Sequence, residues 1–286
     1  SITGGVMKRA ITLLISVFIL GATPWASAGS SQAEGESFFD PGQIIDFSKK
    51  VEKILAANQA RIAIIGRVGR PRKDLPKGIV FTHTAIAVYS RITTDGGQTL
   101  PGYAIYNLYQ KPETPSQSHL IQDFPVDFFS GVRILEAGVI IPTQAMQKRL
   151  LAVLASDTYR SLHNSNYSII ANPFNRERQN CTEFILDLLF SAIYKTSDPD
   201  VIKKNVKTYF TAQPLHISPL KASIGSLFIS ELTVSDHPGK LQTTTFTSIR
   251  NFLDQYQLVE KYLVIDEKMR QDSWAQTGFC EKKPAI

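Results

Sequence analysis

Two strand-like runs that are placed to pair with each other constrain the fold of this chain more than any other feature. One run covers residues 79–92 and the other 102–109, and both are rich in β-branched and aromatic residues. The segment between them, 93–101, is rich in Gly, Thr and Asp, which is typical of a hairpin loop. Buried strands are also expected at 61–68 and 132–141. The sequence therefore predicts an antiparallel sheet.

Amphipathic patterns predict the helices that cover this sheet. Asp40, Pro41 and Gln43 supply an N-cap, a first-turn proline and a capping partner, so a first helix is expected to run to about residue 60. Apolar residues at helical spacing predict further helices over 142–162 and over 181–194. Helices and an antiparallel sheet together indicate the α+β class.

The rest of the chain continues the same kind of pattern. A polar loop is expected at 112–119, short strands such as 225–234 follow later, and a final helix is expected around 246–256. No internal repeat or low-complexity linker separates these segments. We therefore expect one domain over 40–286, in which 195–286 packs on as a C-terminal extension.

The first residues have the three parts of a secretory signal. A short basic stretch precedes an apolar run at 11–20, and a small-x-small cleavage site ends at Ala28. The apolar run is too short to cross a bilayer comfortably. Residues 1–28 are therefore expected to be a signal peptide, with 1–6 as an over-extended start, and 29–39 a flexible leader.

Composition excludes several classes of protein. A chain that is 43% hydrophobic and 20% charged has the make-up of a folded protein rather than a disordered one. Two cysteines are too few for a disulfide framework or a four-cysteine zinc site. A net charge of +6 falls well short of a nucleic-acid-binding signature. We expect a periplasmic bacterial protein with no nucleic-acid partner, metal or cofactor, and no stable membrane insertion after signal cleavage.

The surroundings of Cys181 give the strongest signal of a functional site. Asn180 is a good N-cap, and Glu183 can complete a capping box with it. Cys181 is therefore expected at the first position of a helix, where backbone N–H groups and the helix dipole stabilise a thiolate and a developing oxyanion. This arrangement suits a nucleophile. A disulfide with Cys280 and an inert buried thiol are the structural alternatives.

A thiol nucleophile needs a general base, and His83 is the best placed of the five histidines. It stands near the start of the first hairpin strand, and a rigid strand fixes the position of an imidazole. The partner strand brings Asn107 or Tyr106 across from it, depending on the register. Asn107 is the better partner because its amide oxygen can accept the imidazole N–H and hold one tautomer. Tyr106 is the reserve.

A resemblance to a known group of enzymes follows from these residues. A strand-borne His83, a polar residue on the next strand, and Asn180-Cys181-Thr182-Glu183 opening a helix resemble the circularly permuted branch of the NlpC-type, papain-like cysteine hydrolases. That branch includes YiiX-like bacterial proteins and relatives of lecithin:retinol acyltransferase, and its histidine precedes its cysteine. The stretch 61–194 also resembles an exported bacterial family of uncharacterised function. The segments that carry this second likeness are 66–71, 106–110, 171–175 and 179–184.

The resemblance implies a circularly permuted papain-like fold, in which an antiparallel sheet packs against the helix that carries Cys181 at its N-terminus. It also implies that Cys181 is the nucleophile, His83 the base and Asn107, or Tyr106 in reserve, the third member. The acyltransferase relatives have a second histidine on the partner strand. This chain has none there, which disfavours retinyl-type or phospholipid-type acyl transfer.

The function implied is that of an exported thiol hydrolase or acyl transferase that acts on an amide or ester of the cell envelope. A peptidoglycan peptide and a lipid ester are the candidate substrates, and no cofactor is required. The alternative is a non-catalytic envelope binding or assembly module, with Cys181 buried or disulfide-bonded.

The remaining charged and aromatic residues have ordinary interpretations. Arg67 and the basic residues at 70–73 are expected to form a solvated turn. Asp123, Asp127 and Glu136 are expected at the surface, since nothing in the sequence places them together. Three phenylalanines are expected in the core or along a groove, at positions 124, 128 and 129.

Overall fold

A computed structural model describes residues 37–216 and 233–269 of the chain. The expected signal peptide at 1–28, most of the expected strand at 225–234, and Cys280 lie outside the described residues.

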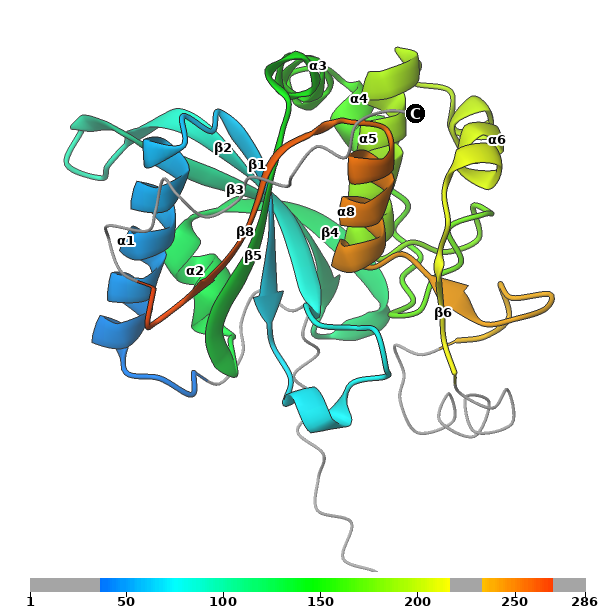
Figure 1. Ribbon diagram of the computed structural model, residues 1–286, viewed down its shortest axis with the longest axis horizontal. Coiled ribbons are helices and arrows are strands. Elements are labelled where there is room, and N and C mark those ends of the chain that lie inside the picture. The colour runs from blue at the N-terminus through cyan, green and yellow to red at the C-terminus, as the bar shows by residue number, and fades with distance from the viewer. Residues whose placement is uncertain (1–36, 217–232, 270–286) are drawn as a thin grey trace, which may run out of the picture.

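An antiparallel six-stranded sheet forms the centre of the protein, with the strand order β4-β3-β2-β1-β5-β8 (Figure 1). Its strands are β1 (Ile62–Val68), β2 (His83–Thr93), β3 (Thr99–Lys111), β4 (Thr114–Asp123), β5 (Ile134–Pro142) and β8 (Val259–Asp266). Two short strands, β6 (Gln213–Pro214) and β7 (Gln242–Thr243), pair separately. The predicted hairpin is the β2–β3 pair, and the α+β class is confirmed.

Helices cover both faces of the sheet (Figure 1). They are α1 (Pro41–Ala57), α2 (Pro125–Ser130), α3 (Gln144–Leu154), α4 (Thr158–Ser161), α5 (Cys181–Tyr194), α6 (Pro199–Tyr209) and α8 (Phe246–Gln255), and a short 3-10 turn covers Arg72–Asp74. We call the side covered by α1 and α2 the α1 face, and the side covered by α3, α5 and α8 the α5 face. Within the described ranges, none of these helices has the length and apolar character to cross a membrane.

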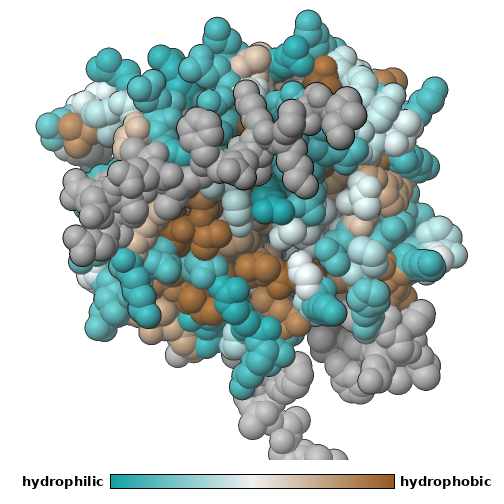
Figure 2. Space-filling model, viewed as in Figure 1, coloured by the Kyte–Doolittle hydropathy of each residue, from teal (hydrophilic) through white to brown (hydrophobic). Residues whose placement is uncertain are grey.

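Alternation along the strands divides the core between the two faces. On β1, Ile62 and Ile64 belong to the core of the α5 face, whereas Ala63 and Ile65 belong to that of the α1 face. This double burial explains why the strand is apolar on both sides, and each fully buried side chain of this size contributes roughly 1.5–3 kcal/mol. Hydrophobic residues that remain visible gather near the middle of the view in Figure 2, between hydrophilic surfaces.

Two stretches differ from the sequence-based expectation. The predicted polar loop at 112–119 is wrong, because β4 begins at Thr114 and forms the outer edge of the sheet. Edge strands need only one paired side and tolerate polar residues, which removes the usual strand signal. The expected helix over 142–162 is interrupted, since α3 ends at Leu154 and α4 begins at Thr158.

The described part of the expected C-terminal extension contributes to the main sheet. The strand β8 pairs with β5 over seven residue pairs, from Glu136–Asp266 to Pro142–Val259, and forms the edge opposite β4. The helix α8 packs its buried residues into the core of the α5 face.

A pair of glycines allows two aromatic rings to lie against the sheet. Gly66 on β1 pairs with Gly138 on β5, and Phe81 and Phe246 cover both. The two rings meet edge to face with centroids 4.8 Å apart. A Cβ on Gly138 would lie 2.6 Å from Phe81 and 2.7 Å from Phe246, which is closer than real contacts allow. Only glycine fits this approach without a shift of the rings.

Candidate functional site

The start of α5 is built by a side-chain cap. Asn180 Oδ1 accepts hydrogen bonds from the backbone N–H groups of Thr182 (3.1 Å) and Glu183 (2.9 Å). Its Nδ2 donates to the carbonyl of Ile169 and to Thr243 Oγ1, at 3.2 and 3.3 Å. Asn180 therefore ties the first turn of α5 to two neighbouring segments and fixes where the helix begins.

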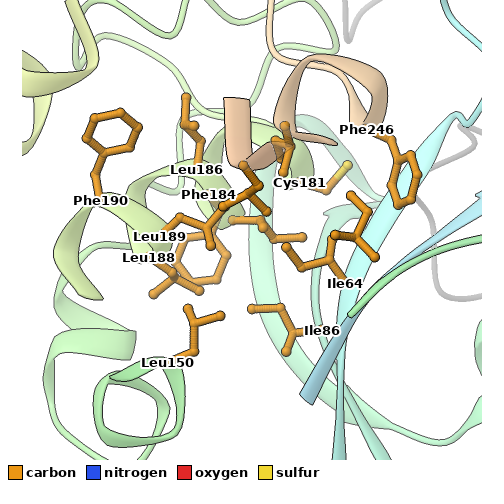
Figure 3. Close-up of a cluster of buried hydrophobic side chains, with 14 of the residues drawn as sticks. Ile64, Ile86, Leu150, Cys181, Phe184, Leu186, Leu188, Leu189, Phe190 and Phe246 are labelled. Atoms are coloured by element: carbon orange, nitrogen blue, oxygen red, sulfur yellow. The ribbon is translucent and has the colours of Figure 1, made fainter. Parts of the chain in front are cut away.

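Cys181 is the first residue of α5 and lies in the core of the α5 face. It is 3% exposed and belongs to the cluster that also holds Phe246 and Ile64, as Figure 3 shows. Its Sγ lies 3.6 Å from Thr182 Oγ1. The predicted position at the N-terminus of a helix is confirmed, so the thiol stands at the positive end of the helix dipole, which stabilises negative charge.

Glu183 has a different partner from the one predicted. It does not complete a capping box with Asn180, because its Oε1 accepts a hydrogen bond from Lys203 Nζ of α6 at 2.7 Å. The same ammonium contacts Asp187 Oδ1 at 2.8 Å and Oδ2 at 3.0 Å. All three side chains are buried, and burial raises the pKa of Glu183 to about 8 despite the opposing effect of Lys203. This cluster fixes α6 against the helix that carries Cys181.

His83 and Asn107 are in direct contact on the α1 face. The register aligns Ile86 with Tyr106, so Asn107 lies diagonally from His83 on the neighbouring strand. Asn107 Oδ1 is 3.1 Å from His83 Nε2. Tyr106, the reserve partner, points to the α5 face, where its ring packs against Tyr159.

Two residues that were not predicted for the site fix the orientation of the Asn107 amide. Asn107 Nδ2 donates to Asp123 Oδ1 at 2.7 Å, and Tyr109 donates its hydroxyl to Asp123 Oδ2 at 2.9 Å. Because Nδ2 faces an acceptor, the amide oxygen faces His83, and Nε2 must carry the imidazole proton. The lone pair is then on His83 Nδ1, which is buried and makes no hydrogen bond with the described residues.

Stacking and burial set the state of the imidazole. The His83 ring stacks on Tyr109 with centroids 4.9 Å apart, and Phe128 of α2 covers it at 5.6 Å. His83 is fully buried. Burial, and next the nearby Arg67 guanidinium, hold the pKa of His83 well below its ordinary value. The imidazole is therefore neutral at neutral pH, which is the form required of a base.

Arg67 is the cross-strand partner of His83 and is 1% exposed, so the predicted solvated turn is wrong for this residue. Its guanidinium lies over the rings of Phe128 and Tyr109 and donates a hydrogen bond to the Phe128 carbonyl. Burial lowers the pKa of Arg67, and acidic neighbours that include Cys181 oppose this effect. Arg67 thus interacts electrostatically with both Cys181 and His83.

Asp123 and the phenylalanines also depart from expectation in part. Asp123 was expected at the surface, but its carboxylate accepts the two hydrogen bonds from Asn107 and Tyr109 described above. Burial raises the pKa of Asp123 to about 7, against the opposing effects of Tyr109, Arg67 and Asn107. Phe128 is fully buried as predicted, whereas Phe124 is exposed.

Cys181 and His83 approach the same end of the sheet from opposite faces. Along β2, His83 alternates in step with Ala85 and Ala87, which belong to the core of the α1 face. Cys181 belongs to the core of the α5 face. No hydrogen bond joins the two residues. Three cavities of about 370, 430 and 480 Å³ on the described surface are lined by other residues.

Among the described residues, no three His, Cys, Asp or Glu side chains are grouped so that they could hold a metal ion. The arrangement offers a neutral, oriented imidazole and a thiol at a helix N-terminus, with a buried cation near both. These are the groups used in nucleophilic catalysis by cysteine.

Comparison with known proteins gives one match. No curated protein and no solved structure matches the chain. The family model described as an uncharacterised protein conserved in bacteria (DUF2145) matches residues 54–253, more than half of the chain. The matched region includes β1 to β5 and α5, and hence every residue of the site described above. The chain therefore belongs to the bacterial family DUF2145.

Proposed function

We propose that this protein is an exported thiol hydrolase or acyl transferase with a circularly permuted papain-like fold, acting on an amide or ester of the cell envelope. The observation that carries the proposal is the hydrogen bond from His83 Nε2 to Asn107, since it leaves Nδ1 as the basic atom of a buried, neutral imidazole. The position of Cys181 at the first residue of α5 supports the role of nucleophile. The order of His83, Asn107 and Cys181 along the chain is that of the permuted cysteine hydrolases.

In the proposed reaction, His83 Nδ1 takes the proton from Cys181 Sγ, and the thiolate attacks the carbonyl carbon of the substrate. The positive end of the α5 dipole stabilises the oxyanion. The bond to the leaving group then breaks, His83 returns the proton to that group, and a thioester remains. Water or an acceptor alcohol or amine attacks the thioester, with His83 first as base and then as acid, and the thiol is restored.

The reaction requires a rearrangement at the end of the sheet. Cys181 and His83 approach from opposite faces, so substrate binding has to bring the thiol to His83 Nδ1. In enzyme structures without substrate, catalytic hydrogen bonds are often long or poorly aligned and tighten only when the substrate binds. The Arg67 guanidinium interacts electrostatically with both residues.

A specific observation favours the alternative, a non-catalytic binding or assembly module. Both Cys181 and His83 are buried, and no hydrogen bond joins them. In that case the hydrogen bonds around Asn107 stabilise the sheet and have no catalytic role. Cys181 would then be either a buried thiol or one half of a disulfide with Cys280.

The experiment that separates the two functions uses 4-nitrophenyl acetate on the purified protein without its leader. The enzyme predicts a burst of nitrophenolate and an acetyl group on Cys181, located by peptide mass spectrometry. Cys181→Ala should abolish the burst, and His83→Ala should slow it by about 10²-fold or more. His163→Ala is the matched control, because His163 forms a hydrogen bond with Ser118 outside this site. This variant should leave the burst unchanged.

Three results would establish the non-catalytic alternative. One is a Cys181–Cys280 disulfide in the oxidised protein. Another is a Cys181 that iodoacetamide labels only after unfolding, and the third is an acetylation rate that His83→Ala leaves unchanged. If the burst is found, peptide amides and long-chain esters offered in turn would identify the substrate class.

A further inference from the structure

The hydrogen bonds around His83 continue beyond the residue that the sequence assigned as its partner. Asn107 is held by Asp123 at 2.7 Å, whereas its other acceptor, the carbonyl of Ile105, is at the limiting distance of 3.5 Å. Asp123 is in turn held by Tyr109 at 2.9 Å. Of the two acceptors of Asn107 Nδ2, Asp123 therefore makes the stronger hydrogen bond.

The amide of asparagine can present either its oxygen or its nitrogen to a neighbour, because a half-turn exchanges them. With Asp123 ionised, a half-turn would place Asn107 Oδ1 against a carboxylate oxygen, so two acceptors would face each other. It would also place Nδ2 against His83 Nε2, which would then have to accept. Asp123 therefore opposes the turned amide, and this choice fixes which nitrogen of His83 carries the proton.

We propose that Asp123 is a positioning residue that acts through Asn107 to keep His83 in the Nε2–H tautomer, with the basic lone pair on Nδ1. Tyr109 supports it in two ways, since its hydroxyl donates to Asp123 and its ring stacks on His83. Under the function proposed above, on which the catalytic meaning of this inference rests, the tautomer places the base on the nitrogen that is not occupied by Asn107.

The test measures the tautomer directly, by ¹⁵N–¹H correlation spectra of His83 in the full protein without its leader. Wild type should show the Nε2–H form. Asp123→Asn keeps an acceptor oxygen for Asn107 and should retain it. Asp123→Leu removes the acceptor, so the amide can turn and the Nδ1–H form should exceed half of the population. Asp127→Asn is the matched control, because Asp127 is a neighbouring carboxylate that caps α2 and makes no contact with Asn107, and it should show the wild-type tautomer.

A wild-type spectrum with the proton on Nδ1 would overturn the inference, and this result does not depend on any variant. Asp123→Leu with an unchanged tautomer, or Asp127→Asn with a changed one, would also overturn it. If the leucine variant does not fold, Asp123→Ala removes the same acceptor at lower steric cost. The same spectra are then recorded with each variant combined with Cys181→Ala, which separates the two proposals. A tautomer that follows Asp123 while no variant is acetylated would disprove the thiol hydrolase but leave the positioning role intact.

Discussion

Removal of the buried ammonium between α5 and α6 is expected to be among the most damaging single changes in the described residues. Lys203→Met keeps a side chain of similar length and deletes three contacts of 2.7–3.0 Å to Glu183 and Asp187. Both carboxyl groups stay buried, at 1% and 6% side-chain exposure. The variant therefore leaves two acidic groups next to each other without their cation.

Breaking a buried ion pair from one side typically costs 3–5 kcal/mol, because an uncompensated charge remains. We expect Lys203→Met to lower the free energy of unfolding by about that amount at pH 8. The loss should be smaller at pH 5. A buried carboxyl group without its cation can be neutralised by taking up a proton, and this uptake costs less free energy as the pH falls towards the ordinary pKa of an acidic side chain.

Urea unfolding followed by circular dichroism at pH 5 and pH 8 measures both effects. Lys204→Met is the matched control, because Lys204 is the next residue of α6 and is exposed, and it should change stability by less than about 0.5 kcal/mol. A loss below about 1 kcal/mol at pH 8 would refute the reasoning, as would equal losses at the two pH values. Lys203→Met combined with Glu183→Gln and Asp187→Asn should recover part of the stability, because the charges are then removed together.

Three further outcomes can be checked by the same unfolding measurements. Folding raises the pKa of Asp123 from its ordinary 3.8 to about 7, so its contribution to stability is present at low pH and is lost as the pH rises through this window. The stability of Asp123→Asn relative to wild type should therefore rise by about 2 kcal/mol between pH 5 and pH 8, and a flat difference would contradict the burial argument. Gly138→Ala should lower the free energy of unfolding by about 1–3 kcal/mol, because the added methyl group displaces the aromatic rings over β5. Gly42→Ala adds a methyl group at an open helix position and should raise the free energy of unfolding by about 0.5–1 kcal/mol. Similar effects at both glycines would be inconsistent with a steric cause. Asn180→Ala should cost about 1–2 kcal/mol through the lost cap of α5, and Asn180→Asp, which keeps the acceptor, should cost less; equal losses would show that the cap is not the reason.

Local patterns were sufficient for the parts of the fold that local interactions determine. The first helix begins at Pro41, and Gln43 Oε1 accepts the backbone N–H of Asp40 at 3.1 Å, as the sequence predicts. The helix at Cys181–Tyr194 has the predicted bounds. In both cases a capping residue precedes an apolar stripe, so the signal lies within one segment.

Contacts between segments could not be predicted in the same way. Arg67 carries a charge next to other basic residues, and only the pairing of β1 with β2 under α2 shows that it is buried. Asp123 contacts Asn107 because of the β3–β4 register, which the sequence does not specify. The strand that ends at Asp123 is itself polar, so it gave no strand signal.

The face to which a strand residue points is a further limit of sequence reasoning. His83 was expected to face the thiol because a strand fixes its geometry. A strand fixes the alternation but not which side a helix covers. The burial of Ala85 and Ala87 under α1 shows the side to which His83 belongs. A histidine and a cysteine can therefore be correctly placed on their elements and still lie on opposite faces of the sheet.

The place of β8 at the edge of the sheet affects how the protein can be shortened for laboratory work. A fragment cut where the family match ends, at residue 253, would stop inside α8 and lose β8 entirely. The outer side of β5 would then present a row of unsatisfied amide and carbonyl groups, which recruits strands from other molecules. Such a fragment should precipitate or form oligomers, whereas a chain that retains residues through 269 keeps that border closed.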